Sequence, residues 1–282
     1  MSDSGKPEES KGLLRRLFRK RGRPKTRFGR ILMSLRWVLY GAIALYILLL
    51  IFPQVIFPYS IEKHNIRIYS FQPLAPEAEA RLDEIHTRLS RCELYDSRVG
   101  GRLFVCNDPG IYRLFVPFHG EMYAVSRPVF GHVFIARAEV ETNRTGSPDI
   151  ETSKRTFVSV AAHELTHMLI YDHLGFWGNF GLKRWVAEGY CEYVSGNYNY
   201  PELAGINNLI KGRSIDDPNF DYFTWETMVM YMIEVKGLDF DEILDIQDDY
   251  DGIKNETVQW LEGVYRDIME GKQEKLQWPE LD

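Results

Sequence analysis

The sequence contains a run of 21 residues without a charged side chain, from Trp37 to Phe57. Because about 20 apolar residues are needed to cross the hydrocarbon core of a bilayer, the run predicts a membrane-spanning helix over 37–57. Trp37 and Tyr40 at one end, and Tyr59 beyond the other, are typical of the aromatic residues found at membrane surfaces. A cleaved signal peptide is the alternative, but its apolar region is usually only about 7–15 residues long. We therefore expect a retained anchor.

Charge is divided unevenly on the two sides of this run. Residues 1–36 carry twelve Lys or Arg and three acidic residues, a net of +9, so the formal charge of −6 for the whole chain leaves −15 for the rest. Basic segments stay on the cytoplasmic side, which predicts a cytoplasmic tail over 1–36 and places residues 58–282 outside the cytoplasm. The acidic body would repel phosphates, which argues against nucleic acid as a partner.

The hydrophobic pattern after the anchor divides the chain into two parts, 58–148 and 149–282. The first is expected to be an α/β part, with an amphipathic helix over 76–91, strands over 101–107 and within 123–140, a turn at 108–110 and a loop over 142–150. The second is expected to be helical, with helices over 152–172, 185–197, 219–236, 239–247 and 254–272. Strands followed by helices predict an α+β fold with the helices on one side.

The pattern with the most specific chemistry is His-Glu-x-x-His over 163–167. On a helix, His163 and His167 project from the same face, within reach of one metal ion. Glu164 lies between them and can face a water bound to that ion, which is the position of a general base. The alternative is a helix whose two histidines are solvated or satisfied within the core.

Catalytic zinc has three protein ligands and a fourth position for water, so the two histidines need a third partner. The segment WVAEGYCEY over 185–193 follows them and resembles the second zinc helix of the gluzincins, the thermolysin-like metallopeptidases, whose pattern is roughly W-x-x-E-G-x-A-x-Y. The resemblance implies a zincin-like fold, zinc as the cofactor and Glu188 as the third ligand. Cys191 stands in place of the small Ala of that pattern and is expected to be a core residue.

The resemblance also implies two supporting residues. Glu192 lies one turn after Glu188, where thermolysin-like enzymes often carry an acid that accepts the free N–H of the first histidine; the alternative is a surface carboxylate. Tyr222 lies fifteen residues before Gly237. At this spacing, aminopeptidase N-type gluzincins place a hydroxyl that stabilises the oxyanion; the alternative is an anchor for an amphipathic helix.

Two cysteines flank a Gly-Gly turn at 100–101, in the part expected outside the cytoplasm, where disulfides persist. They are Cys92 and Cys106. Two alternatives stay open for them, a disulfide bridge and two buried free thiols.

Together these features predict a single-pass membrane protein that hydrolyses peptide bonds outside the cytoplasm. Zinc would be held by the two histidines and Glu188, with Glu164 as the general base and Tyr222 as the donor to the oxyanion. The partners would be a peptide or protein substrate and the lipid bilayer, through residues 37–57, with no nucleic acid. Two other functions stay open: a catalytically silent zincin-fold binding or scaffold protein, against which Glu164 argues, and a zinc hydrolase of a non-peptide amide or ester.

Overall fold

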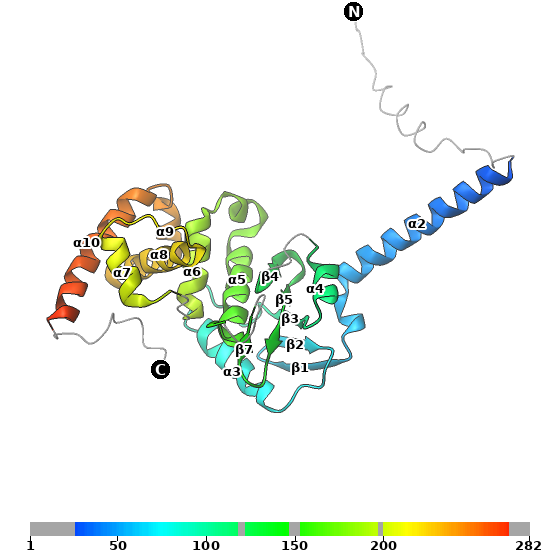
Figure 1. Cartoon of the computed structure of the whole chain (residues 1–282), viewed down its shortest axis with the longest axis horizontal. Helices are drawn as coiled ribbons and strands as arrows, with labels where there is room; N and C mark the ends of the chain where they lie inside the picture. Colours follow the sequence, from blue (N-terminus) through cyan, green and yellow to red (C-terminus); the bar gives the residue numbers. More distant parts are fainter. Residues whose placement is uncertain (1–25, 118–121, 147–152, 197–199, 271–282) are drawn as a thin grey trace, which may run out of the picture. The chain divides into compact units, whose positions relative to one another are not determined.

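The computed structural model of the chain describes residues 26–117, 122–146, 153–196 and 200–270 (Figure 1). The chain divides into two compact units, Met1–Phe52 and Pro53–Asp282. Most of the basic tail expected over 1–36 lies outside the described residues.

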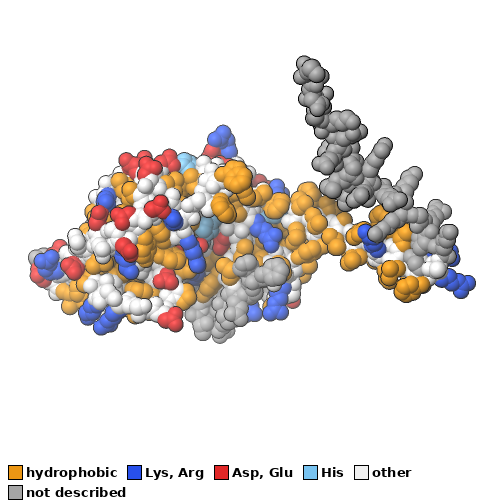
Figure 2. All heavy atoms as spheres, turned by 90° about the horizontal axis from the view of Figure 1, so that it is seen from above, with side chains coloured by type: hydrophobic (Ala, Val, Ile, Leu, Met, Phe, Trp, Pro, Cys, Tyr) orange, Lys and Arg blue, Asp and Glu red, His pale blue; other side chains and the backbone are white. Residues whose placement is uncertain are grey.

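The first unit contains helix α2 (Arg27–Ile51), of which Arg30–Ile51 is long and apolar enough to cross a membrane. At 1.5 Å per residue, these 22 residues span about 33 Å, compared with a hydrocarbon core about 30 Å thick. Figure 2 shows hydrophobic side chains along most of the helix. The helix begins ten residues before the uncharged run and ends ahead of Pro53, whose ring and missing N–H do not allow a helix to continue.

The last residues of the uncharged run belong to the second unit. Pro53–Ile56 form a short 3-10 helix, η1, and Phe57 is buried. The Phe57 ring packs against those of Phe71 and Phe104, with ring centroids 4.4 and 5.1 Å apart. Phe57 is therefore a core residue, so the apolar helix does not extend to the end of the run as the sequence suggested.

The second unit is built on a five-stranded mixed sheet with the strand order β1-β2-β3-β5-β4. Its strands are β1 (Tyr59–Lys63), β2 (Ile66–Ser70), β3 (Gly101–Val105), β4 (Ala124–Arg127) and β5 (His132–Ile135). β2, β3 and β5 run parallel, whereas β1 and β4 are antiparallel to their neighbours and form the two edges. A separate pair joins β6 (Ala138–Glu139) to β7 (Arg144–Thr145).

Helices interleave with the strands and then follow them. α3 (Glu77–Leu89) connects β2 to β3, as the amphipathic pattern over 76–91 predicts. The other helices are α4 (Pro109–Phe115), α5 (Phe157–Gly181), α6 (Arg184–Ser195), α7 (Glu202–Ile210), α8 (Pro218–Met230), α9 (Phe240–Ile246) and α10 (Tyr250–Met269). The 3-10 helix η2 (Pro128–Phe130) lies between β4 and β5. The α+β fold class is confirmed.

Some local predictions are wrong. Residues 108–110 do not form an isolated turn: the Asp108 side chain accepts hydrogen bonds from the backbone N–H groups of Gly110 and Ile111 and so caps α4. The helix expected over 219–236 is α8 followed by a π-helical turn, η3 (Tyr231–Val235). Helix α7 and the β1–β2 hairpin are not predicted at all, because short segments carry little periodic signal.

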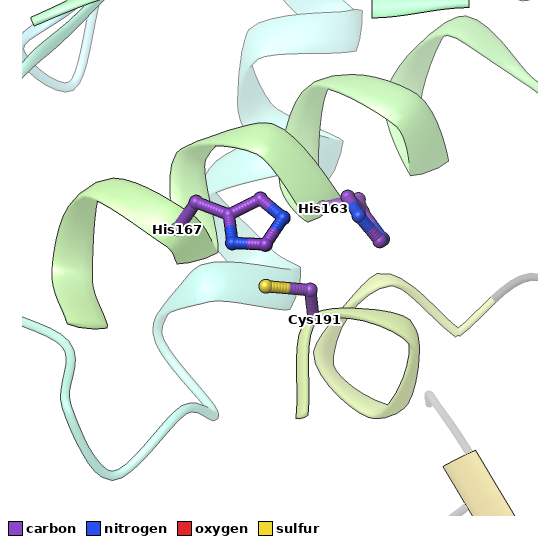
Figure 3. Close-up of side chains that lie close together, drawn as sticks. All are labelled: His163, His167 and Cys191. Carbon is purple, nitrogen blue, oxygen red and sulfur yellow. The ribbon is translucent and has the colours of Figure 1, made fainter. Parts of the chain in front are cut away.

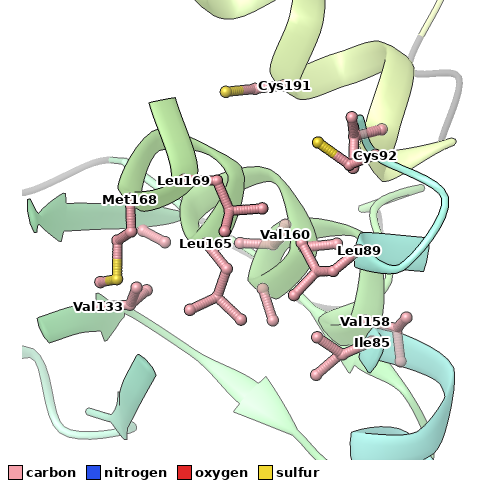
Figure 4. Close-up of a cluster of buried hydrophobic side chains, with 14 of the residues drawn as sticks. Ile85, Leu89, Cys92, Val133, Val158, Val160, Leu165, Met168, Leu169 and Cys191 are labelled. Carbon is pink, nitrogen blue, oxygen red and sulfur yellow. The ribbon is translucent and has the colours of Figure 1, made fainter. Parts of the chain in front are cut away.

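Helix α5 packs on the sheet, and this contact fixes the helix in place. Leu165 and Met168 of α5 belong to the same buried cluster as Val133 of β5 and Leu89 of α3 (Figure 4). The closest approach is at Gly101, where an added Cβ would lie 2.1 Å from Cδ2 of Leu165. Glycine at this position therefore allows α5 to lie directly against the sheet.

The two cysteines expected near the Gly-Gly turn are buried and are not joined by a disulfide. The Sγ of Cys92 lies 3.5 Å from the hydroxyl oxygen of Tyr190, and the Sγ of Cys106 lies 3.6 Å from the carbonyl oxygen of Phe104. Burial raises the pKa of both thiols, that of Cys106 to about 12, which keeps them protonated and unreactive. Of the two alternatives, the structure has the free thiols.

Thiol labelling measures this state directly. We expect three reactive thiols per chain after unfolding without reductant, and almost none in the folded protein, because all three cysteines are at most 6% exposed. A single reactive thiol after unfolding would instead show that Cys92 and Cys106 are bridged.

Candidate metal centre

The His-Glu-x-x-His residues lie in the first half of helix α5. Thr156 precedes the helix and forms a capping box with Ser159: each side-chain oxygen accepts a hydrogen bond from the backbone N–H of the other residue. From this fixed start, His163 and His167 fall one turn apart with ring centroids 5.0 Å apart. The expected helix and the shared face of the two imidazoles are confirmed.

Both histidines point toward a single carboxylate oxygen on helix α6. The Nε2 atoms of His163 and His167 lie 3.3 and 3.6 Å from Oε2 of Glu188. Ligands held tetrahedrally at zinc's usual bond lengths to nitrogen and oxygen stand about 3.3 Å from one another. The two distances to Glu188 are therefore compatible with a shared metal ion, and the three residues are those expected from the histidine spacing and the family resemblance.

Helix α6 can present Glu188 at this place because it packs very closely on α8. An added Cβ at Gly189 would lie 2.5 Å from the carbonyl oxygen of Trp225 in α8, so that only glycine fits there. The close approach brings Glu188 and Tyr222 of α8 into the same cleft. The Glu-Gly pair of the sequence pattern thus has a direct structural reason.

A cysteine also lies near the two histidines. One ligand atom from each of His163, His167 and Cys191 falls within 4.8 Å of the others (Figure 3). However, Cys191 is fully buried and does not line the cleft that His163, His167 and Glu188 share. Burial, followed by the charge of Glu188, raises the pKa of its thiol far above the usual range. We therefore favour Glu188 over Cys191 as the third ligand.

Metal content distinguishes the two candidates. We expect the wild-type chain and Cys191→Ala to hold close to one zinc per chain after purification with zinc, and Glu188→Ala to hold almost none, because Glu188 places a carboxylate oxygen within 3.6 Å of the Nε2 atoms of both histidines. Elemental analysis of the purified proteins measures this, with His163→Ala as the control for complete loss. Zinc retained in Glu188→Ala but lost in Cys191→Ala would assign the site to the cysteine.

Behind the metal ligands lies a buried ion pair. The Oε1 atom of Glu192 lies 3.3 Å from Nδ1 of His163, at an angle that departs from that of a hydrogen bond, and accepts a hydrogen bond of 2.5 Å from Arg155. Glu192 is 2% exposed, so it is not the surface carboxylate of the alternative interpretation. Burial alone would raise its pKa, but Arg155 and His163 outweigh burial and lower it. The sequence analysis did not identify Arg155.

These carboxylates also set the charge of the first histidine. Burial alone would lower the pKa of His163, but Glu192 and then Glu188 outweigh it and raise the pKa to about 10. Without metal, the ring therefore carries a proton at neutral pH, and metal binding must release it. A further acid, Glu226 of α8, is almost fully buried, and burial together with the Glu192 charge raises its pKa well above the usual range, which keeps it neutral.

The metal ligands open onto a cleft of about 410 Å³. Glu164 lines this cleft beside the ligands, on the same helix. The opposite wall is the edge strand β4 and the residues just before it, from Met122 to Ser126. Glu164 and residues of the edge strand β4 thus line the same cleft.

Tyr222 lies near the start of α8 and lines the same cleft. Its hydroxyl oxygen accepts a hydrogen bond of 3.4 Å from Arg184, whose guanidinium also stacks over the ring of Trp225 at 5.5 Å. Burial, followed by the Glu188 charge, raises the pKa of Tyr222, so the phenol keeps its proton at neutral pH. Tyr222 thus shares the cleft with His163, His167 and Glu188. Arg184, which orients it, was not identified from the sequence.

No protein-family model matches this chain, and no curated protein matches it. Neither comparison identifies the gluzincins, so the resemblance of the zinc-helix pattern stays a prediction. The case for a metal centre rests on this chain's own residues: two imidazole nitrogens directed at one carboxylate oxygen in an open cleft.

Proposed function

We propose that this chain is a zinc metallopeptidase of the gluzincin type, with a zincin-like catalytic unit tethered to a membrane by α2. The observation that carries the proposal is the convergence of His163 and His167 on Glu188, beside Glu164, at the floor of one cleft. A purely structural role for the two histidines and Glu188 would not require the second carboxylate, that of Glu164, to line the cleft beside them.

Each residue of the site has a distinct task. Zinc, when bound, lowers the pKa of a water ligand toward about 7 and polarises the substrate carbonyl. Glu164 takes the proton of the attacking water and passes it to the leaving amine. The Tyr222 hydroxyl donates a hydrogen bond to the oxygen on which negative charge develops. Glu192 holds the ring of His163 in orientation and is itself held by Arg155.

The edge strand β4 favours a peptide over a small ester as the substrate. Among the described strands, β4 pairs with β5 alone, so its other edge has no strand partner there, and Ala124, Val125 and Ser126 of β4 line the cleft. An extended peptide can add to such an edge by main-chain hydrogen bonds, which would carry the scissile carbonyl past the ligands. This geometry supports an endopeptidase that recognises the main chain of its substrate as well as the side chains.

Activity against peptides tests the proposal. The full chain, purified in detergent with zinc, should digest a broad peptide library, and a chelator should abolish the digestion while added zinc restores it. Stoichiometric zinc without cleavage of any peptide would contradict the peptidase and favour a binding protein with a zincin-like fold.

The orientation in the membrane has its own test. Basic residues at the start of α2, Arg27, Arg30 and Arg36, favour a cytoplasmic N-terminus, which places Pro53–Asp282 outside the cytoplasm. We expect an external protease to degrade the second unit in intact cells. Degradation only after the cells are opened would contradict this orientation.

A further inference from the structure

The segment that follows the metal helix exposes three aromatic side chains. Residues 174–182, with the sequence LGFWGNFGL, contain no charge. Within it, Phe176 is 57% exposed, Trp177 82% and Phe180 84%. Trp177 and Phe180 are the two most exposed aromatic side chains among the described residues. The structure therefore leaves a large apolar surface in water.

The backbone conformation of the segment holds these aromatic side chains in their exposed positions. Gly175 interrupts α5 with φ 66° and ψ −176°, a conformation open almost only to glycine, and the chain then makes a short helical turn over 176–181. Leu174 and Leu182, at the two ends of the segment, pack against the hydrophobic core. The segment is thus fixed at both ends, and the aromatic side chains between them point outward.

The chemistry of the segment fits a bilayer surface. Aromatic side chains are enriched where hydrocarbon meets the headgroups, and uncharged segments can enter that layer without desolvating a charge. Lys183 and Arg184 follow directly, but Lys183 pairs with Asp248 and Arg184 donates to Tyr222, so the attraction to a bilayer comes from the uncharged segment itself. A protein partner of defined specificity would instead be expected to meet charged or hydrogen-bonding groups, and the segment offers only one amide, that of Asn179.

The anchor helix α2 would keep the second unit close to a membrane. Phe52 alone separates Ile51, at the end of α2, from Pro53, at the start of the second unit. If α2 spans a membrane, the second unit stays at the surface of that membrane, and even a weak apolar contact is then favoured by the high effective concentration. A soluble partner has no such advantage.

We infer that residues 174–182 insert into the interface of the bilayer to which α2 anchors the chain. This inference rests on the proposed tether and does not depend on the proposed hydrolase chemistry. Because Leu174 comes seven positions after His167 along α5, insertion would hold the proposed metal centre about 10 Å along the helix axis from the inserted end. The cleft would then be within reach of substrate polypeptides that lie close to the membrane surface.

Spin labels on the full chain test the insertion. The three native cysteines are buried, so a cysteine introduced by Phe180→Cys, or in a second variant by Trp177→Cys, is labelled selectively in the folded protein. The matched control is Leu203→Cys, at an exposed leucine on α7. The chains are reconstituted in vesicles of phosphatidylcholine and phosphatidylglycerol, and accessibility to oxygen and to a water-soluble nickel chelate is measured.

We expect labels at 180 and 177 to lie roughly 5–10 Å below the headgroups, with nickel accessibility several-fold lower than at 203. Equal nickel accessibility at all three positions, in chains that float with the vesicles, would overturn the insertion and leave the tether intact. Strong spin–spin broadening at 180 would show contact between two copies of the chain and would also overturn it. Chains that do not float with the vesicles would overturn both the tether and the insertion.

Discussion

Replacing Glu164 with glutamine is expected to lower the rate of peptide hydrolysis by about 10²–10⁴-fold, because the amide keeps the shape of the side chain but cannot accept the proton of water. Zinc content should not change, since Glu164 lines the cleft without being one of the three converging donors. Single-turnover cleavage of a library-derived peptide, with elemental analysis of the same samples, measures both quantities. The matched control is Glu79→Gln, an exposed glutamate on α3 that should leave the rate unchanged.

Tyr222→Phe gives a graded comparison in the same assay. Loss of one donor to the oxyanion is expected to cost about 10²–10³-fold, with zinc content again unchanged. A Glu164→Gln variant that cleaves its peptide as fast as the wild type would contradict the proposed mechanism, even if zinc is bound at one ion per chain. A Tyr222→Phe variant with full activity would leave the general base in place and reduce Tyr222 to a packing residue.

The shared face of the two histidines could be predicted because helix geometry converts spacing into position. Two histidines four residues apart must share a face, whatever surrounds the helix. Glu188 was expected only from the resemblance to the gluzincin pattern, whose glycine the structure explains by the close packing of α6 on α8. Glu192 follows from Glu188 by the same one-turn rule. Its burial, in contrast, depends on neighbours far away in the sequence.

Residues that meet in the fold but lie far apart in the sequence left no comparable pattern in the sequence. Arg155 lies outside any helix and meets Glu192 thirty-seven residues later, so no periodic pattern links them. The role of β4 as the free edge beside the cleft is set by its pairing with β5 and by the sheet order, which four residues of sequence do not encode. The sequence did contain one clue. A buried carboxylate behind a histidine needs a cation, and Arg155 lies just before α5, the helix that carries His163.

The buried pair of Arg155 and Glu192 is expected to carry the largest effect on stability. Arg155→Met should lower the free energy of unfolding by about 3 kcal/mol, because the substitution removes the closer of the two cations beside the buried Glu192 carboxylate and leaves His163 alone to balance it. Denaturant unfolding of the full chain in detergent, with a chelator present so that zinc loss does not contribute, measures the difference. The matched control is Arg98→Met: Arg98 also pairs with a carboxylate, that of Asp96, but is 89% exposed, so little change is expected.

At acid pH, the difference in the free energy of unfolding between the wild type and Arg155→Met should become smaller. The folded-state pKa of Glu192 is lowered in the wild type, so its contribution to stability is present above the ordinary value of 4.5 and is lost as the pH falls through the lower folded value. Without Arg155, the pKa of Glu192 rises, and the carboxyl takes up a proton at a higher pH than in the wild type. The destabilisation should therefore be largest near neutral pH and smaller below about pH 4.5. A difference that stays constant from pH 7 to pH 4 would show that Arg155 stabilises the fold by packing alone, since loss of packing does not depend on the charge of Glu192.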